Sequence, residues 1–233
     1  EAQAHALRRL FKAKCQDALG DLANRLELSM LREFATWVGK MSEEERVRLK
    51  KLTDAHRQYG ASYKKYLTDN QAWIAKAECR GIKLDVWFAP TPGAFPLPQE
   101  TLSIAHSDDL YDLFMMGEYF QTCLSLDGVN ARAVLTNAYD ANKQVLFVAI
   151  SDKSGGRQVI ARKLLAINSD FKLIGYTTYF RGGSRIEAMY KEIEQAMSVY
   201  CGGFAAHCNL ELASEGGPEP IGHHFWYDDG VCE

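Results

Sequence analysis

The sequence predicts an α+β protein, with an N-terminal helical region and a domain built on a mostly antiparallel sheet of about five strands with flanking helices. Two observations predict this class. Apolar residues recur at helical spacing from Ala4 to Cys79. Three segments rich in β-branched and aromatic residues follow one another from Val145 to Phe180. We therefore expect a helical basic region over residues 1–80 and an α/β domain with an acidic C-terminal segment over residues 81–233.

Length and composition narrow the class further. The 233 residues are 47% hydrophobic, which is typical of a globular protein with a core. No stretch approaches the roughly 20 consecutive apolar residues that a membrane-spanning helix needs, and residues 1–14 carry charges in place of an apolar signal segment. We therefore expect a soluble, cytoplasmic protein without a membrane partner. The first residue is Glu1, as in a chain that is processed or cut from a longer polypeptide.

The net charge of −3 hides an asymmetry along the chain. Residues 1–80 carry 16 Lys+Arg against 11 Asp+Glu, a net of +5, which leaves 11 against 19, a net of −8, for the remainder. No Lys or Arg follows Lys191. An acidic surface repels phosphate groups. Nucleic acid is therefore disfavoured as a partner, although cations alternate with aromatic residues in the stretch Tyr63–Tyr66.

The helical region should contain three or four helices. Ser42 and Glu45 have the spacing of a capping box, so a helix is expected to begin there. A break falls at Gly60, and the next helix should run to about Arg80. The residues Ile82–Ala89 then alternate as in a strand.

The following residues predict a loop, a strand and two helices before the main sheet. Four prolines between residues 90 and 98 indicate a loop. Thr101–His106 is an expected strand, Ser107 to about Tyr119 an expected helix, and Val129–Tyr139 a second one. Three strands come next, at Val145–Ile150, Gln158–Ile167 and Lys172–Phe180. They should be antiparallel, because the connections between them are too short for a parallel crossover. A helix from Arg185 to about Tyr200 should follow.

The third of these strands leads into the loop Arg181-Gly182-Gly183-Ser184-Arg185. Backbone amides in such a loop, together with the N-terminus of a helix, can hold an anion. Over about residues 100–205, the order strand, helix, helix, three meandering strands, loop and helix resembles the core of the GNAT family of acyl-CoA-dependent N-acyltransferases. In that family a Gln/Arg-x-x-Gly-x-Gly/Ala loop holds the pyrophosphate of coenzyme A. Arg181 matches this motif, whereas Ser184 replaces a glycine and the bulky Ile186 replaces a small residue beside the phosphate.

The resemblance implies a GNAT-like acyltransferase or a degenerate acyl-CoA-binding relative. The cofactor would be acyl-CoA, and the acyl acceptor a small-molecule or protein amine. The residues expected to bind the cofactor are Arg181, Gly182, Gly183, Ser184 and Arg185. The second and third strands would part beside this loop and admit the pantetheine arm, with Ile174–Phe180 beside the thioester. A purely structural interpretation also stands, in which the two glycines form a left-handed turn and both arginines are solvated.

Acyl transfer to an amine needs a general base. Glu118, His106 or a chain of water molecules could take this role, and the sequence does not choose among them. Tyr176 and Tyr179 lie three residues apart on one strand, so we expect only one of them to face the cleft.

Cys123 supports a second hypothesis, a cysteine-dependent hydrolase or transferase. The residue follows a predicted helix and precedes a turn at Gly128, where a thiol can be accessible. An imidazole, from His106 or His207, would have to lie within hydrogen-bonding distance and lower the pKa of the thiol. The alternative is a small buried side chain, which is the commonest fate of a free intracellular cysteine.

The end of the chain concentrates histidines and cysteines. They are Cys201, His207, Cys208, His223, His224 and Cys232. Their spacing contains none of the closely paired ligands of a zinc chelate, so no metal is favoured. A third hypothesis makes the chain a noncatalytic interaction domain of a larger protein. In that case its aromatic and acidic ending, His223–Gly230, closes over the core or receives a basic protein partner.

Overall fold

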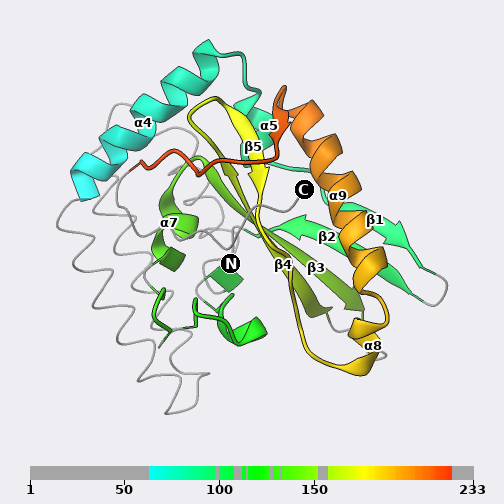
Figure 1. Ribbon diagram of the computed structural model, residues 1–233. Coiled ribbons are helices and arrows are strands. Elements are labelled where there is room, and N and C mark those ends of the chain that lie inside the picture. The colour runs from blue at the N-terminus through cyan, green and yellow to red at the C-terminus, as the bar shows by residue number, and fades with distance from the viewer. Residues whose placement is uncertain are drawn as a thin grey trace. The chain divides into compact units, whose positions relative to one another are not determined.

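Helices and a seven-stranded sheet make up the part of the chain that the computed structural model describes (Figure 1). The described residues are 63–97, 100–107, 112–113, 115–125, 128–131, 133–151 and 157–221. The α+β class predicted from the sequence is confirmed. The helices expected before residue 63, including the one with the capping box at Ser42 and Glu45, lie outside the described ranges.

The sheet is mixed, with strand order β1-β2-β3-β4-β5-β7, and β6 pairs with β4. The strands are β1 (Gly93–Pro96), β2 (Thr101–His106), β3 (Lys143–Ser151), β4 (Arg157–Ile167), β5 (Lys172–Gly175), β6 (Tyr179–Phe180) and β7 (Glu211–Ala213). All pairings are antiparallel except that of β5 with β7. The sequence predicted about five strands; β1, β7 and the separation of β6 from β5 add three, and the strand expected at Ile82–Ala89 is absent because a helix forms there.

The three predicted strands from Val145 to Phe180 are confirmed as an antiparallel meander, but the third is interrupted. Leu165 of β4 pairs with Gly175, whereas Arg162 pairs with Tyr179. Two residues of β4 therefore lie opposite three residues, 176–178. An extra residue on one strand is a bulge, which locally disrupts the pairing and changes the direction of the side chains.

The strand expected at Ile82–Ala89 is wrong, because α5 (Leu84–Phe88) is a short helix. Leu84 and Trp87 are both buried. Their spacing of three residues places them on the same side of one helical turn, whereas a strand would point them to opposite faces. The amide of Trp87 donates a hydrogen bond to the carbonyl of Lys83 at 3.0 Å, which closes the turn.

The proline-rich segment is also more ordered than the predicted loop. Gly93–Pro96 forms β1, which stands at one end of the strand order and pairs with β2 alone. A proline is tolerated on such an edge strand because its missing N–H can face away from the neighbouring strand. The strand at Thr101–His106 is confirmed as β2.

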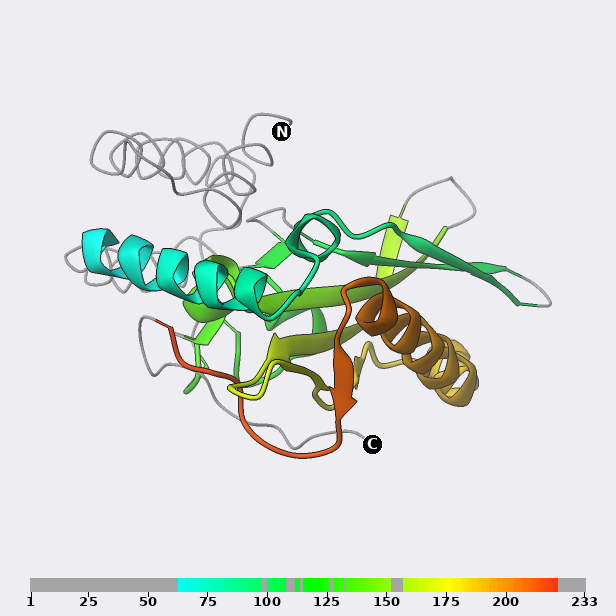
Figure 2. The same ribbon diagram turned by 90° about the horizontal axis from the view of Figure 1, so that it is seen from above.

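Helices α8 (Ser184–Glu187) and α9 (Tyr190–His207) follow β6. Figure 2 shows α9 along one face of the sheet, and it contacts β2 and β7. The helix continues beyond the predicted end at Tyr200 because apolar residues keep helical spacing to its last turn. The buried side chains of α9 are Ile193, Ala196, Met197, Cys201, Phe204 and Ala205.

The other predicted helices are confirmed only in part. α4 (Tyr63–Cys79) ends two residues before Gly81, whose φ of 77° lies in the left-handed region that favours glycine after a helix. α7 (Ala133–Tyr139) is the later part of the second helix predicted after residue 100. Of the helix expected from Ser107 to about Tyr119, residues 108–111 and 114 lie outside the described ranges. Residues 115–117 form a turn in place of a helix, and the 3-10 turn η1 (Glu118–Phe120) follows.

Two compact units divide the chain. The first unit comprises residues 1–76, 108–141 and 220–227, and the second comprises 77–107, 142–219 and 228–233. The second unit contains the whole sheet with α5, α8 and α9. The single boundary predicted at residue 80 stays a prediction, because residues 1–62 are not described. No described helix is both long enough and apolar enough to cross a membrane.

Candidate functional site

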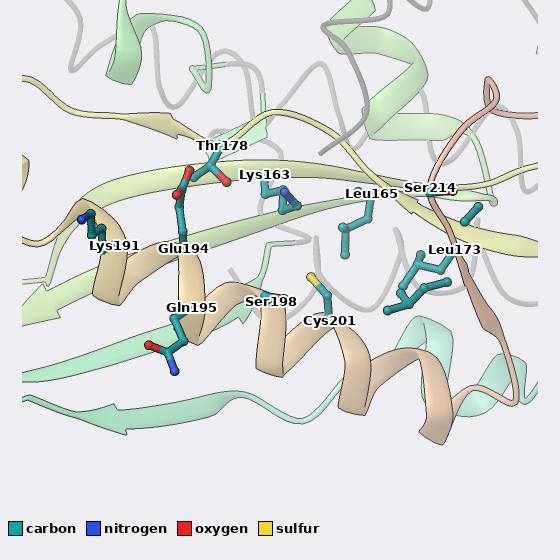
Figure 3. Close-up of a pocket in the computed structure, with 13 residues that line it drawn as sticks. Lys163, Leu165, Leu173, Thr178, Lys191, Glu194, Gln195, Ser198, Cys201 and Ser214 are labelled. Atoms are coloured by element: carbon teal, nitrogen blue, oxygen red, sulfur yellow. The ribbon is translucent and has the colours of Figure 1, made fainter. Parts of the chain in front are cut away.

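A cleft of about 830 Å³ lies in the second unit between α9 and the strands β4, β5 and β7 (Figure 3). The residues of its helical wall are spaced three or four apart, which places them on one face of α9. They are Lys191, Glu194, Gln195, Ser198 and Cys201. A volume of this size is typical of sites for small molecules and cofactors.

The cleft opens beyond the end of β7. Strands β5 and β7 pair only between Lys172–Ile174 and Glu211–Ala213. Beyond Ile174, no described strand pairs with this edge of β5, and the chain enters the bulge at 176–178. Gly175 and Thr178 line the cleft there. Backbone groups at an open sheet edge can form hydrogen bonds with a ligand.

Charged and apolar side chains stand at opposite ends of the cleft. Lys191 and Glu194 lie at the end nearest the start of α9, and Leu173 and Cys201 lie toward the other end (Figure 3). Leu212, the register partner of Leu173, also lines the cleft. The arrangement therefore suits a ligand with one polar and one apolar part.

Lys163 brings a cation to the cleft from the middle of β4. Gly175 makes room for it, since a Cβ at position 175 would lie 2.7 Å from the Cε of Lys163 and 3.7 Å from its Nζ. Within the described part of the chain, Lys163 forms no ion pair or hydrogen bond through its side chain. Burial raises the pKa of the Cys201 thiol to about 11, and the positive charge of Lys163 opposes this rise. The cleft thus holds a half-buried cation and a protonated thiol.

The loop predicted to bind the cofactor lies on the surface, where Arg181, Gly182, Gly183, Ser184 and Arg185 are all exposed. A Cβ on either glycine would meet nothing within 4 Å, and Gly183 has a φ of 134°, where other residues are strained. The Arg185 guanidinium forms an ion pair with Glu100 at 2.9 Å. Ile186 is buried, so its side chain does not obstruct the exposed face of the loop as its size suggested.

The parting expected between the second and third strands is wrong. β4 and β6 stay paired beside the loop, at Ala161 with Phe180. The amide of Arg181 still donates to the carbonyl of Ile160 at 2.8 Å. The edge without a strand partner in the described part of the chain is instead the other edge of β5, beyond the end of β7.

Neither Tyr176 nor Tyr179 lines the cleft between α9 and the sheet edge. Tyr176 is buried. The ring of Tyr179 lies against the Arg162 guanidinium, whose Cζ is 4.7 Å from the ring centroid. The bulge between them breaks the simple alternation of faces on which the expectation of one cleft-facing tyrosine depended.

The predicted general bases, His106 and Glu118, do not line the cleft. His106 ends β2 and packs against the ring of Phe204 on α9, with centroids 4.5 Å apart. Glu118 begins η1 in the first unit. The carboxylate in the cleft is Glu194, which the sequence analysis missed. Its spacing from Lys191 and Ser198 on one helical face was the available signal.

Cys123 lies in the first unit, on a tight turn, and is half-buried. Its carbonyl accepts a hydrogen bond from the amide of Asn130 at 3.0 Å. A Cβ on Gly128 would lie 2.1 Å from that carbonyl oxygen, and one on Gly117 would lie 2.0 Å from the backbone of Leu124. No histidine stands among the described residues of this unit.

The predicted set of C-terminal metal ligands is described only in part. Cys201 and Cys208 are buried and His207 is exposed. His223 and the residues after it lie outside the described ranges. Among the described residues, no three His, Cys, Asp or Glu side chains form a group that could hold a metal ion. The question of a metal site stays at the level of the sequence prediction.

Comparisons with family models, curated proteins and solved structures find no match to this chain. The class is therefore defined by the fold and the cleft alone: an α+β protein with a mixed sheet and a ligand-sized cleft between an edge of that sheet and one helix. The function must be inferred from this geometry.

Proposed function

We propose that the chain is a GNAT-like acyltransferase, or a degenerate relative that binds acyl-CoA, with its ligand in the cleft between α9, β5 and β7. One observation carries the proposal. Strand β7 ends opposite Ile174, which leaves the edge of β5 without a strand partner among the described residues beside the cleft, and the chain leaves β6 through the Gly182–Gly183 loop before it enters α8 and α9. A pantetheine arm needs an opening of this kind beside an unpaired strand.

The order of elements supports the same proposal. From β3 to α9 the second unit has the order of strands, loop and helix that the resemblance implies, and β7 then returns parallel to β5. The residues of the two helices that the resemblance places between β2 and β3 belong to the first unit. The connection through α8 and α9 brings the exposed loop to the charged end of the cleft, because α9 begins three residues after α8 ends. The phosphates of coenzyme A would therefore lie near Arg181, and the thioester further along α9.

The cleft contains groups that fit the chemistry of acyl transfer. In that reaction the acceptor nitrogen bonds to the thioester carbonyl carbon and the carbon–sulfur bond breaks. Negative charge develops on the carbonyl oxygen and then on the leaving sulfur, and Lys163 is the cation in place to stabilise it. Glu194 can accept the proton that the amine loses, and the leaving sulfur takes a proton in turn. The substrate is then a small-molecule or protein amine.

Calorimetric titration with coenzyme A and acetyl-CoA tests the proposal, with one variant that fills the cleft and one that does not. Ser198 lines the cleft and its neighbour Val199 does not, yet both are exposed on α9. We expect Ser198→Trp to weaken binding at least tenfold and Val199→Trp to leave it unchanged. Absence of binding by the unmodified protein, or equal binding by both variants, would exclude the cleft as the cofactor site.

A cysteine-dependent hydrolase or transferase is the second candidate. The half-buried thiol of Cys123 on a turn that two glycines hold tightly favours it. Alkylation should then stop turnover, and Cys123→Ser should protect the protein from this inactivation. Cys201 and Cys208 are buried and should react slowly under the same conditions. If neither acyl-CoA nor a thiol reagent has any effect, the third candidate, a noncatalytic interaction domain with a protein partner, is favoured.

A further inference from the structure

We infer that the acyl donor carries an aliphatic chain of several carbons, which lies at the apolar end of the cleft, and that acetyl-CoA is a poor ligand by comparison. The inference rests on the proposed function and names its substrate class. It follows from three features of the cleft: the order of side chains along α9, the apolar floor and wall at one end, and the exposure of Leu212.

The order along α9 sets the direction in which the ligand lies. Lys191 and Glu194 come first, Ser198 next and Cys201 last. At 1.5 Å per residue, the rise from Lys191 to Cys201 is about 15 Å. The charged end is nearest the loop at Arg181, where phosphates would bind. The other end therefore receives the part of the ligand that is furthest from the phosphates, which is the acyl group.

That end is built from aliphatic side chains. Leu165 and Leu173 are fully buried and form the floor. Leu212 and Ala213 form the wall, with Leu212 directly beside Leu173 in the sheet register. The thiol of Cys201 faces them from α9 and is kept protonated by burial, so it adds no charge. A two-carbon acetyl group would leave most of this surface without contact.

The exposure of Leu212 is the observation that points to a ligand. Only three large hydrophobic side chains are exposed among the described residues: Val129, Val199 and Leu212. Leu212 is 56% exposed and lines this cleft, whereas Val199 lines a separate, smaller hollow of about 250 Å³. Single exposed hydrophobics are common on protein surfaces. When such a side chain lies at the rim of an apolar pocket, however, an alkyl chain of the ligand can cover it, and the removal of apolar surface from water favours binding.

Titration of the full chain with coenzyme A, acetyl-CoA, hexanoyl-CoA and octanoyl-CoA tests the inference. Each methylene buried should tighten Kd by about threefold, so octanoyl-CoA should bind at least 100-fold more tightly than acetyl-CoA. Equal affinity for all four ligands would overturn the inference and leave the proposed cofactor site intact. Binding of none of them would remove the proposed function, and the inference with it. Octanoate added as a competitor shows whether the chain alone occupies the pocket.

A pair of variants locates the effect. Leu212→Asp places a charge at the apolar end, and Val199→Asp places the same charge on an exposed hydrophobic position outside the cleft. Both positions are exposed, so both variants should fold, which the thermal unfolding midpoint of each confirms. We expect Leu212→Asp to abolish the preference for octanoyl-CoA while coenzyme A still binds, and Val199→Asp to keep the preference. A preference that survives in Leu212→Asp would overturn the inference.

Discussion

Lys163 lies across Gly175, so close that a Cβ at position 175 would stand 2.7 Å from the lysine Cε. The two residues are on neighbouring strands, β4 and β5, just before the bulge that follows Gly175. A side chain at position 175 would occupy the space through which the lysine reaches the cleft. Because Gly175 has no side chain, the ammonium group of Lys163 can reach from β4 to the cleft at the edge of the sheet.

Gly175→Ala should weaken coenzyme A binding and hardly change stability. The contacting atom is near the end of a flexible side chain, which can move at a cost below about 1 kcal/mol. The displaced ammonium no longer faces the ligand, and the loss of one charge-assisted interaction predicts a Kd higher by roughly tenfold. In a Lys163→Met background the same glycine substitution should have no further effect on Kd, which a double-mutant cycle by calorimetry measures. Additive effects of the two substitutions would contradict this explanation.

Gly117→Ala and Gly128→Ala should each destabilise the protein strongly. In both cases the added Cβ meets backbone atoms, at 2.0 Å and 2.1 Å, which cannot move without distorting the turn that carries Cys123. Overpacking of this kind typically costs about 1–3 kcal/mol, and we expect the upper end. Urea denaturation measures the loss.

Gly202→Ala provides a control of opposite sign. Gly202 lies inside α9, and a Cβ there would meet nothing within 4 Å. Alanine is favoured over glycine in a helix interior by about 1 kcal/mol, so this variant should be more stable than the unmodified protein. Destabilisation by Gly202→Ala, or none by Gly117→Ala, would contradict the contacts on which both predictions rest.

Local pattern was sufficient to predict the meander from Val145 to Phe180 and the helix that follows it, because short connections between apolar segments leave only hairpins. It was not sufficient for the residues after Gly81. Ile82, Leu84 and Val86 alternate with polar residues as in a strand, whereas Leu84 and Trp87 have helical spacing. Over so few residues the pattern does not choose, and the burial of Leu84 and Trp87 decided for the helix. The short β7 carries no strong strand signal of its own, since it forms by pairing with β5 after the chain returns along α9.

The candidate site was harder to predict because its residues come from elements far apart in the sequence. In the sequence nothing distinguishes Lys163 from other strand residues. It lines the cleft only because Gly175 lies beside it on the neighbouring strand. Glu194 and Ser198 read as the solvated face of an amphipathic helix. The sequence did indicate the loop at Gly182, but not that Arg185 pairs with Glu100. These relationships depend on strand register and crossover, which periodicity does not contain.

The ion pair of Arg185 with Glu100 predicts unequal roles for the two arginines of the loop. Arg181→Ala should weaken coenzyme A binding by one to two decades in Kd, since a charge-assisted hydrogen bond contributes about 1.5–3 kcal/mol. Arg185→Ala should have a smaller effect, because its guanidinium is already bound at 2.9 Å. Glu100→Gln frees Arg185 and should tighten binding, at a cost in stability of at most about 1 kcal/mol. Calorimetry on the three variants would contradict this order if Arg185→Ala proved the more damaging.

Cys201 predicts a loss of stability at alkaline pH. Burial raises its pKa from 9.0 to about 11 in the folded protein, so the folded state holds the thiol proton more tightly than the unfolded chain does. The contribution is fully present below pH 9, where the thiol is protonated in both states, and is lost as the pH rises from 9 through 11. The loss is on the order of 3 kcal/mol for a shift of this size. Urea unfolding at pH 8 and at pH 11 measures it.

Cys201→Ala should lose less stability over this interval than the unmodified protein, and Cys79→Ala, at an exposed position, should lose as much. Burial raises the pKa values of Cys208 and Tyr200 to about 12 as well, so these two groups contribute to the loss of stability at alkaline pH in every variant. An identical loss in Cys201→Ala and Cys79→Ala would show that the thiol in the cleft is not the group that titrates.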